Sequence, residues 1–172
     1  MRILGIDPGY AIIGCGTVAY DGHSFKALDY RAITTEAGTA FPQRLLKIED
    51  DLLALLDLVQ PDAIAIEKLY FNTNTTTAID VAQARGVIVA SCARRQIPIY
   101  EYTPLQVKLA VVGYGRAEKH QVMEMTRMML GLAKVPRPDD VADALAMAIC
   151  CAHSDGAAIF RRLMKKTGVS SK

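Results

Sequence analysis

Residues 2–9 are Arg2-Ile3-Leu4-Gly5-Ile6-Asp7-Pro8-Gly9, a short apolar run that ends in an acid and a turn signal. An apolar run of this length, closed by Asp-Pro-Gly, predicts a buried strand over residues 2–6. The strand leads directly into Asp7, so this carboxylate lies at the C-terminal end of the strand. Ligands bind at that end of the strands in open α/β sheets, which makes Asp7 the first candidate functional residue.

The elements that follow predict a mixed sheet flanked by helices. Strand patterns cover residues 11–20 and 24–35, and the Asp21-Gly22 pair between them is typical of a hairpin turn. Apolar residues then recur at helical spacing over residues 45–59, and Pro61 ends that helix. The remaining expected elements are a strand at 63–67, a helix at 76–95, a strand at 97–102, and helices at 104–112, 118–132 and 139–153. Three strands followed by alternating helices and strands indicate an α/β fold.

Length and composition exclude several classes of protein. The 172 residues fit one domain, which we place at 1–155, followed by a basic and flexible C-terminal tail at 156–172. The longest unbroken apolar run, Ala144–Ala152, has nine residues, whereas a membrane span needs about 20, so we expect no membrane partner. The four cysteines lack metal-site or disulfide spacing, which predicts reduced, buried thiols and a cytoplasmic location.

The net charge of +2 conceals an asymmetry along the chain. Residues 1–84 carry 6 Lys and Arg against 11 Asp and Glu, a net charge of −5, whereas residues 85–172 carry 14 against 7, a net charge of +7. An acidic first half and a basic second half hint at a polyanionic partner.

Three regions bring acids to the same predicted edge of the sheet. Glu67 ends the strand at 63–67, and parallel pairing of this strand with the first would place Glu67 beside Asp7. At the start of the last helix, Asp140 and Asp143 are three residues apart and share a face. Carboxylates this close repel one another unless a hard divalent cation such as Mg²⁺ binds them. Four carboxylates suit two such ions, which activate a water and stabilise a leaving oxygen.

Each of these acids also has a purely structural explanation. Asp7 before Pro-Gly is a common turn former, and a single Glu67 after an apolar strand is often a surface residue. Asp139 suits the N-cap of the last helix, whereas Asp143 fits a terminal role less well because it adjoins the apolar run. Position alone therefore leaves a metal site and ordinary turn and cap residues both open.

The sequence around these acids resembles the RuvC family of bacterial Holliday-junction resolvases. The matching segments, in the family's order, are Leu4-Gly5-Ile6-Asp7-Pro8-Gly9, Ala65-Ile66-Glu67, Gln83-Ala84-Arg85-Gly86, Val107-Lys108, Gly113-Tyr114-Gly115-Arg116-Ala117-Glu118-Lys119 and Asp140-Val141-Ala142-Asp143-Ala144-Leu145-Ala146. The resemblance implies an RNase H-like fold, a five-stranded mixed sheet flanked by helices. It also implies a homodimer whose two active sites make paired nicks in a four-way DNA junction, in recombination and DNA repair. The helix at 76–95 would then lie at the dimer interface, although its small residues suit packing on the sheet equally.

The resemblance assigns the catalytic residues and their metal. Asp7, Glu67, Asp140 and Asp143 would be catalytic and would bind two Mg²⁺ ions per active site, with Mn²⁺ as a substitute. The family's closing pattern, D-x-x-D-A-L-A, aligns on Asp140, so Asp139 becomes a helix-capping neighbour. Two-metal hydrolysis of the phosphodiester bond would leave a 5′-phosphate and a 3′-hydroxyl. A branch-migration helicase complex is a further partner expected from the family.

Six residues are expected to contact DNA, namely Tyr70, Phe71, Arg85, Lys108, Arg116 and Lys119. Lys119 matches a family lysine that would balance negative charge near the scissile phosphate; an exposed lysine at a helix start is the plainer alternative. Tyr70 matches a family aromatic residue, which could stack on an unpaired base, although one of the two rings could instead anchor the loop. Lys108 and Arg116 flank Gly113-Tyr114-Gly115, whose glycines allow close approach to phosphates unless the loop simply joins two helices.

Three other functions compete with junction cleavage. A YqgF-type RNase H-like nuclease would act on another nucleic acid, but such chains are usually shorter and lack the closing motif. An actin-like or sugar-kinase ATPase opens with a similar Ile-Asp-x-Gly hairpin, but needs a second lobe that 172 residues cannot supply. A non-catalytic junction-binding protein is disfavoured by intact carboxylates at all four positions.

Overall fold

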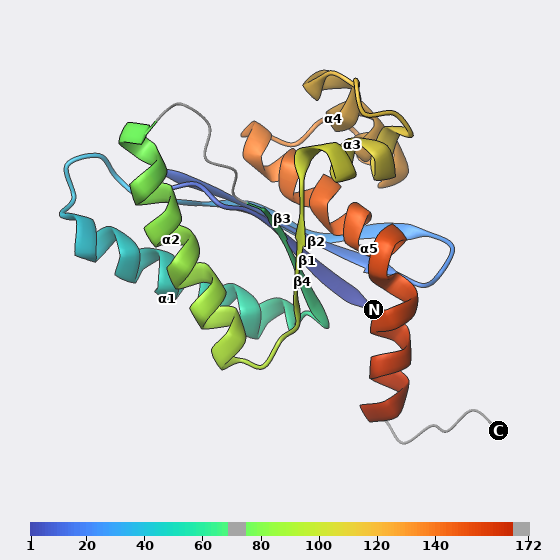
Figure 1. The fold of residues 1–172 in the computed structure, drawn as a ribbon, viewed down its shortest axis with the longest axis horizontal. Coiled ribbons are helices and arrows are strands. Elements are labelled where there is room, and N and C mark those ends of the chain that lie inside the picture. The colour runs from blue at the N-terminus through green and yellow to red at the C-terminus, as the bar shows by residue number, and fades with distance from the viewer. Residues whose placement is uncertain (69–74, 167–172) are drawn as a thin grey trace.

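Strands and helices follow one another in the order expected from the sequence. The computed structural model describes residues 1–68 and 75–166. The strands are β1 (Arg2–Asp7), β2 (Ile12–Tyr20), β3 (Phe25–Thr34), β4 (Ala63–Glu67) and β5 (Ile99–Tyr102). The helices are α1 (Phe41–Val59), α2 (Thr75–Arg94), α3 (Pro104–Val112), α4 (Lys119–Met129) and α5 (Asp139–Lys166). These five strands form one sheet, with helices on both of its faces (Figure 1).

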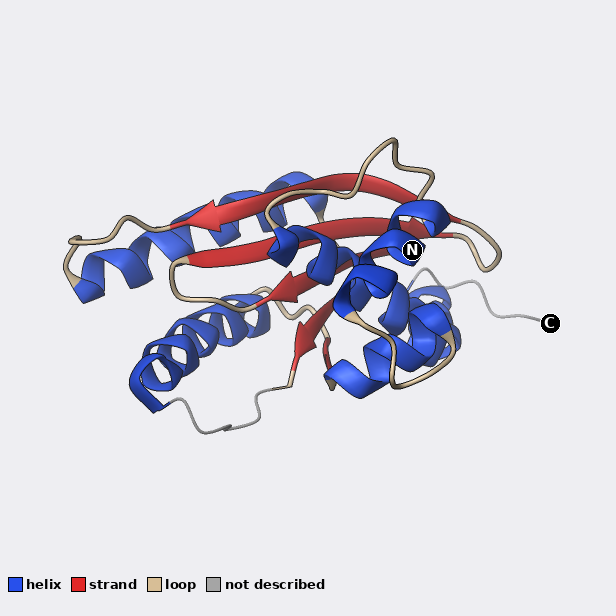
Figure 2. Ribbon diagram, turned by 90° about the horizontal axis from the view of Figure 1, so that it is seen from above, coloured by secondary structure: helices blue, strands red, loops and turns tan. Residues whose placement is uncertain are grey.

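The sheet is mixed, as predicted. Its strand order is β3-β2-β1-β4-β5, in which β2 pairs antiparallel with β1 and β3, and β4 pairs parallel with β1 and β5 (Figure 2). The antiparallel part arises from short turns: Asp21 accepts hydrogen bonds from the backbone N–H groups of His23 and Ser24 in the β2–β3 hairpin. The parallel part arises because α1 carries the chain back along the sheet before β4 begins.

Two layers of helices enclose the sheet. α1 and α2 cover one face, and α5 covers the other, with α3 and α4 packed against α5 (Figure 1). The α1–α2 face is filled by large aliphatic side chains such as Leu4, Ile48 and Leu52, each at most 1% exposed. The spacing of four between Ile48 and Leu52 places both on the buried side of α1. α1 ends at Val59, because Gln60 adopts a left-handed conformation immediately before Pro61.

α5 lies close to the sheet because glycines face it. Gly14 of β2 pairs across the strands with Asp7, and a Cβ atom added to Gly14 would lie 1.9 Å from the carbonyl oxygen of Asp140. A Cβ atom added to Gly5 would lie 1.9 Å from the carbonyl oxygen of Ala144. Both distances are far inside van der Waals contact, so any side chain at either position would push the helix outward. The glycines thus bring the first turns of α5 to the C-terminal end of β1.

The last helix is longer than the sequence predicted. We expected it to end at His153 and a flexible tail to begin at residue 156, but α5 continues to Lys166. The continuation has a packing reason, because Ile159 is fully buried and Leu163 packs against the same core. The expected boundary at residue 155 therefore falls inside a helix. Residues 167–172 lie outside the described part of the chain.

By length and composition, α5 is also apolar enough to cross a membrane, over Asp139–Lys165. However, 61% of that apolar window is buried inside the protein, where it packs mainly on β1 and β2. The core helix of a soluble protein passes the same test, so the apolar composition of α5 is explained by its contacts with the sheet.

All four cysteines are free and buried, as predicted. Burial raises the pKa of the Cys15, Cys92 and Cys151 thiols to about 12, so these thiols stay protonated at neutral pH. Protonated thiols are poor nucleophiles and poor metal ligands. The cysteines therefore serve the core and not the chemistry of the protein.

Candidate active site

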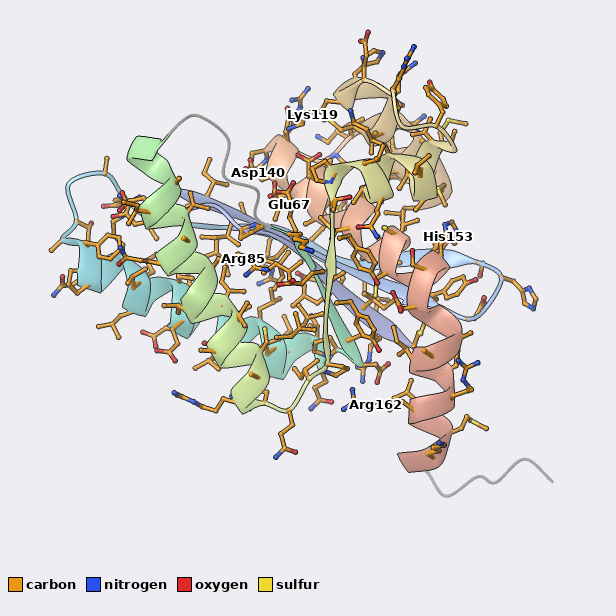
Figure 3. All side chains as sticks on the ribbon, viewed as in Figure 1. Glu67, Arg85, Lys119, Asp140, His153 and Arg162 are labelled. Atoms are coloured by element: carbon orange, nitrogen blue, oxygen red, sulfur yellow. The ribbon has the colours of Figure 1, made fainter. Side chains whose placement is uncertain are left out.

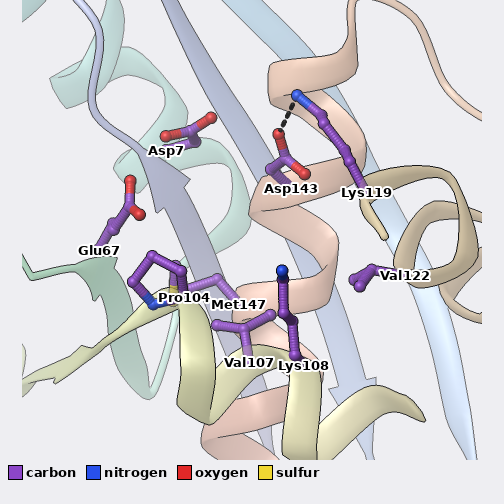
Figure 4. Close-up of a pocket in the computed structure, with 9 residues that line it drawn as sticks. All are labelled: Asp7, Glu67, Pro104, Val107, Lys108, Lys119, Val122, Asp143 and Met147. Atoms are coloured by element: carbon purple, nitrogen blue, oxygen red, sulfur yellow. Dashed lines mark ion pairs between the residues drawn. The ribbon is translucent and has the colours of Figure 1, made fainter. Parts of the chain in front are cut away.

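Asp7 and Glu67 lie at the same edge of the sheet (Figure 4). β1 and β4 are parallel, and their pairing runs to the residue before each acid, so both strands deliver a carboxylate to the same end. Both acids line a cavity of about 220 Å³, together with Asp143 from α5 and Lys119 from α4. The structure thus brings Asp7 and Glu67 together in the way that parallel pairing predicted.

α5 brings two further acids to this edge. Asp143 lines the cavity, whereas Asp140, earlier in the same helix, is not among the lining residues. The charge of Asp140 nevertheless raises the pKa of both Asp7 and Asp143, so Asp140 lies within electrostatic reach of both. Asp139 stands at the first residue of α5, forms an ion pair with Arg137 and does not line the cavity.

Burial and mutual repulsion favour the protonated form of these acids. The pKa of Asp7 is raised from 3.8 to about 7, chiefly by burial and then by the charges of Glu67, Asp143 and Asp140. Burial also raises the pKa of Glu67, and the charge of Asp143 adds to that shift. The charge of Lys119 opposes both shifts without cancelling them. The cluster therefore carries more negative charge than the protein itself neutralises.

Lys119 is the first residue of α4, and its side chain reaches the acids. Its Nζ lies 2.9 Å from Oδ2 of Asp143 (Figure 4) and 3.8 Å from Oδ2 of Asp139. Gln121 accepts a hydrogen bond from the backbone N–H of Glu118, which fixes the first turn of α4 and the base of the lysine side chain. The Lys119 side chain remains 57% exposed, so its ammonium group is accessible to a substrate.

The rest of the cavity wall is apolar, and the sequence analysis did not identify it. It consists of Pro104 and Val107 from α3, Val122 from α4 and Met147 from α5. Apolar side chains exclude water from one side of the acids, which strengthens electrostatic interactions within the cavity. The sequence did carry a signal for the start of α3: Thr103 is followed three residues later by Gln106, and in the structure the two form a capping box at the N-terminus of α3, directly after β5. Which residues of α3 face the acids depends on how α3 packs against α5.

Three of the predicted DNA-contacting residues lie on or near α3 and α4. Lys108 and Lys119 line the cavity, and Arg116 is exposed between the two helices. Gly113 has a φ of 90° and ends α3 in the left-handed conformation, which gives this glycine a structural role at the helix terminus. The positive charges of Lys108 and Lys119 therefore lie on the wall of the cavity that holds the acids.

Of the other three predicted contacts, only Arg85 lies within the described residues, on α2. Arg85 is largely buried: its guanidinium pairs with Glu101, and its Nε donates a hydrogen bond to the backbone carbonyl of Glu67. Sequence reasoning did not identify Glu101, which has no motif around it. Tyr70 and Phe71 lie outside the described residues.

The acids suit a hard divalent cation by their chemistry. They offer carboxylate oxygens, which Mg²⁺ prefers, and the charges of the neighbouring acids help burial to raise the pKa of Asp7, so an added positive charge would be favourable there. Across residues 1–68 and 75–166, no three His, Cys, Asp or Glu side chains stand close enough together to hold a metal ion as they are.

Comparison with known proteins gives the family. The family model described as crossover junction endodeoxyribonuclease RuvC matches residues 3–151, which include all four acids. The chain belongs to the RuvC family. RuvC of Alkaliphilus metalliredigens is 60% identical over 154 residues, which cover 90% of this chain and 94% of that protein. RuvC of Clostridioides difficile is 54% identical over 155 residues, which cover 90% and 92%.

A solved RuvC structure has the same fold. Thermus thermophilus RuvC in complex with Holliday junction substrate has a TM-score of 0.87 at 34% identity, covering 92% of this chain and 97% of that one. The yeast mitochondrial Holliday junction resolvase Ydc2 shares the fold with a TM-score of 0.65 at 12% identity, covering 96% and 85%. The RNase H-like fold expected from the RuvC resemblance is therefore confirmed, including its five-stranded mixed sheet.

Proposed function

We propose that this RuvC-family protein is an endonuclease that resolves four-way DNA junctions by hydrolysing phosphodiester bonds, in recombination and DNA repair. The observation that carries the proposal is the gathering of Asp7, Glu67 and Asp143 around one cavity with Lys119. Such a cluster of acids is needed for cleavage and would serve no purpose in binding DNA alone. The relatives are named as crossover junction endodeoxyribonucleases, and the Thermus thermophilus protein was solved with a Holliday junction substrate.

Four acids would hold the metal ions. Asp7, Glu67, Asp140 and Asp143 would bind two Mg²⁺ ions per active site, with Mn²⁺ as a substitute. When bound, such ions supply an activated water for in-line attack and stabilise the departing 3′ oxygen. Their charge would also relieve the repulsion that helps raise the pKa of Asp7.

Two lysines would place the scissile phosphate over the acids. Lys108 and Lys119 both line the cavity, and their positive charges complement a phosphodiester group. Lys119 is paired with Asp143. If its ammonium group formed an ion pair with the phosphate instead, that carboxylate would be free to bind metal. In the transition state the same ammonium would balance the growing negative charge on the phosphoryl oxygens.

Paired symmetric nicks require two active sites, and α2 offers a surface for a homodimer. Its inner face packs on the core through Ala84, Ile88 and Cys92. Its outer face carries a stripe of exposed residues at helical spacing, namely Ile79, Gln83, Gly86, Ala90 and Ala93. Most of these are small, so two copies of α2 could pack closely across a two-fold axis. The small residues of α2 therefore supply both the packing on the core and this outer stripe.

The proposal includes DNA contacts and cellular partners. Arg116 would contact phosphates near the active site, because it is exposed beside α4. Tyr70 or Phe71 would stack on an unpaired base at the junction centre. A cytoplasmic location and a branch-migration helicase complex as partner are consistent with a protein that acts on junction DNA.

A cleavage assay with Mg²⁺ on three substrates tests the function. We expect ligatable, paired nicks in a four-way DNA junction and no cleavage of a linear duplex or an RNA–DNA hybrid. Junction binding without cleavage would instead identify a binding protein. Preferential cleavage of the hybrid would identify another kind of RNase H-like nuclease.

Asp7→Asn is the matched control for this assay. The variant keeps the shape of the side chain but loses the charge that a metal ion requires. We expect cleavage to be abolished and the Kd for the junction to stay within about three-fold, because Asp7 should hold metal and not DNA. A variant that still nicks the junction in Mg²⁺ would remove Asp7 from the catalytic set.

A further inference from the structure

The charged side chain of Arg85 points into the protein and away from solvent. It lies on α2, and only 16% of its side chain is exposed. Its Nε donates a hydrogen bond of 3.3 Å to the backbone carbonyl oxygen of Glu67, and its guanidinium also pairs with the carboxylate of Glu101. Figure 3 shows Arg85 and Glu67 between α2 and the neighbouring strands. Both acceptors of this arginine therefore belong to the sheet.

The carbonyl group bonded by Arg85 lies where the sheet gives least support. The ladder between β1 and β4 ends one residue before Glu67, so within the sheet Glu67 is held through its pairing with Tyr102 of β5. Backbone groups at the end of a strand need other partners to stay ordered. Arg85 supplies such a partner at the residue whose side chain lines the cavity.

Glu101 fixes the direction of the guanidinium. It lies on β5 opposite Ile66, so Arg85 joins α2 to both β4 and β5. The planar fork of an arginine can bond two acceptors in a fixed geometry, whereas a lysine presents one compact charge. Without Glu101, the guanidinium would keep one acceptor and lose the constraint on its orientation.

We propose that Arg85 and Glu101 form a positioning pair, which holds the end of β4 and thereby sets the Glu67 carboxylate relative to Asp7. The inference rests on the proposed nuclease function. Arg85 is not among the residues that line the cavity, so it acts through Glu67 and not on the substrate. Small displacements of a catalytic group are costly, since about 1 Å can reduce a rate by about 100-fold.

The test uses four variants of the full chain. Arg85→Ala removes both bonds, Arg85→Lys keeps the charge, and Glu101→Gln removes the ion pair. Arg95→Ala is the matched control, because it breaks the exposed ion pair with Asp57 just beyond the other end of α2. The measurements are the single-turnover cleavage rate at saturating protein, the junction Kd at two salt concentrations, and the Mg²⁺ concentration for half-maximal rate.

The positioning role predicts a loss of rate with affinity retained. Arg85→Ala should lower the single-turnover rate by about 10-fold to 100-fold, raise the Mg²⁺ requirement several-fold, and leave the junction Kd within about three-fold. Arg85→Lys and Glu101→Gln should fall between this variant and the wild type. Arg95→Ala should match the wild type in every measurement.

Other outcomes would overturn the proposal. A weaker junction Kd, a salt slope reduced by about one and an unchanged rate at saturation would make Arg85 a phosphate contact. Wild-type behaviour of Arg85→Lys and Glu101→Gln would also overturn it, and these two variants serve if Arg85→Ala does not fold.

A separate measurement covers the case in which the wild type does not cleave the junction and the proposed function fails. A smaller Mg²⁺-induced rise in Tm for Arg85→Lys than for the wild type would still support the positioning of Glu67. An equal rise would contradict it.

Discussion

The two faces of the sheet are packed in different ways. On the α1–α2 face, large side chains such as Ile48 and Leu52 separate the helices from the strands. On the α5 face, the backbone carbonyl of Asp140 occupies the space that a Cβ atom of residue 14 would fill, which only glycine allows. The first arrangement fills the space between helix and sheet with apolar side chains, whereas the second gives up side-chain volume to bring a helix terminus close to the end of β1. The comparison shows that the closest backbone packing occurs where acids from separate elements must meet.

Replacing Gly14 by alanine should have the largest effect on this comparison. The new methyl group would overlap the carbonyl of Asp140, so α5 would have to move away from β1 and take Asp143 with it. We expect the junction cleavage rate to fall more than about 100-fold. The free energy of unfolding should fall by about 1–3 kcal/mol. Single-turnover cleavage and urea denaturation measure the two effects.

Leu52→Ala on the opposite face is the matched control. It should lower the free energy of unfolding by about 2–5 kcal/mol, because it leaves a cavity in the α1–α2 core. The folded variant should keep its cleavage rate within about two-fold, since no acid is displaced. If both substitutions changed rate and stability in the same proportion, the two faces would not differ in the way that we describe.

Within α5, Asp140→Asn should be far more damaging than Asp139→Asn. Asp140 acts electrostatically on Asp7, whereas Asp139 is paired with Arg137 and Lys119 and does not line the cavity. We expect a loss of about 100-fold in rate for Asp140→Asn and less than about three-fold for Asp139→Asn. Equal activities of the two variants would mean that the family's closing motif has been aligned one residue out of place.

Lys119→Ala should have a smaller effect, because it removes one positive charge and no acid. We expect single-turnover cleavage at saturating protein to slow by about 10-fold, since Lys119 lies 2.9 Å from Asp143 at the mouth of the site. The measurement is the rate in Mg²⁺ at protein concentrations well above Kd. An effect confined to junction affinity would assign Lys119 to phosphate positioning alone.

The smallest effect should appear in the pH dependence of stability without metal. The pKa of Asp7 is raised to about 7 in the folded protein, so the folded state binds more protons than the unfolded state between about pH 4 and pH 7. Stability should therefore fall as pH rises through this range. Asp7→Asn should be more stable than the wild type at pH 8, and the difference should disappear as the pH falls towards 4.

Thermal unfolding in a chelator at several pH values measures this difference. Addition of Mg²⁺ should raise the Tm of the wild type more than that of Asp7→Asn, because the ion compensates a charge that the variant lacks. Parallel stability curves for the two proteins would show that Asp7 does not titrate differently in the folded state.

Much of the fold could be predicted because its signals are local. The apolar runs that end in Asp7 and Glu67 marked two strands and their ends, and Asp21-Gly22 marked a hairpin. The end of α5 could not be predicted in this way. The helix continues past His153 because Ile159 finds a buried position, and burial depends on the neighbouring elements.

By itself, the sequence determined the order of the elements, the motifs of the RuvC family and the acids that reach the ends of β1 and β4. These features depend on residue periodicity and turn chemistry, which act over a few neighbouring residues. Only the tertiary structure decided that Gly14 faces Asp140, that apolar side chains of α3 wall the cavity, and that Arg85 bonds Glu67 and Glu101. Such contacts join residues far apart in the chain, and they are chosen by how helices pack on a sheet and not by local sequence.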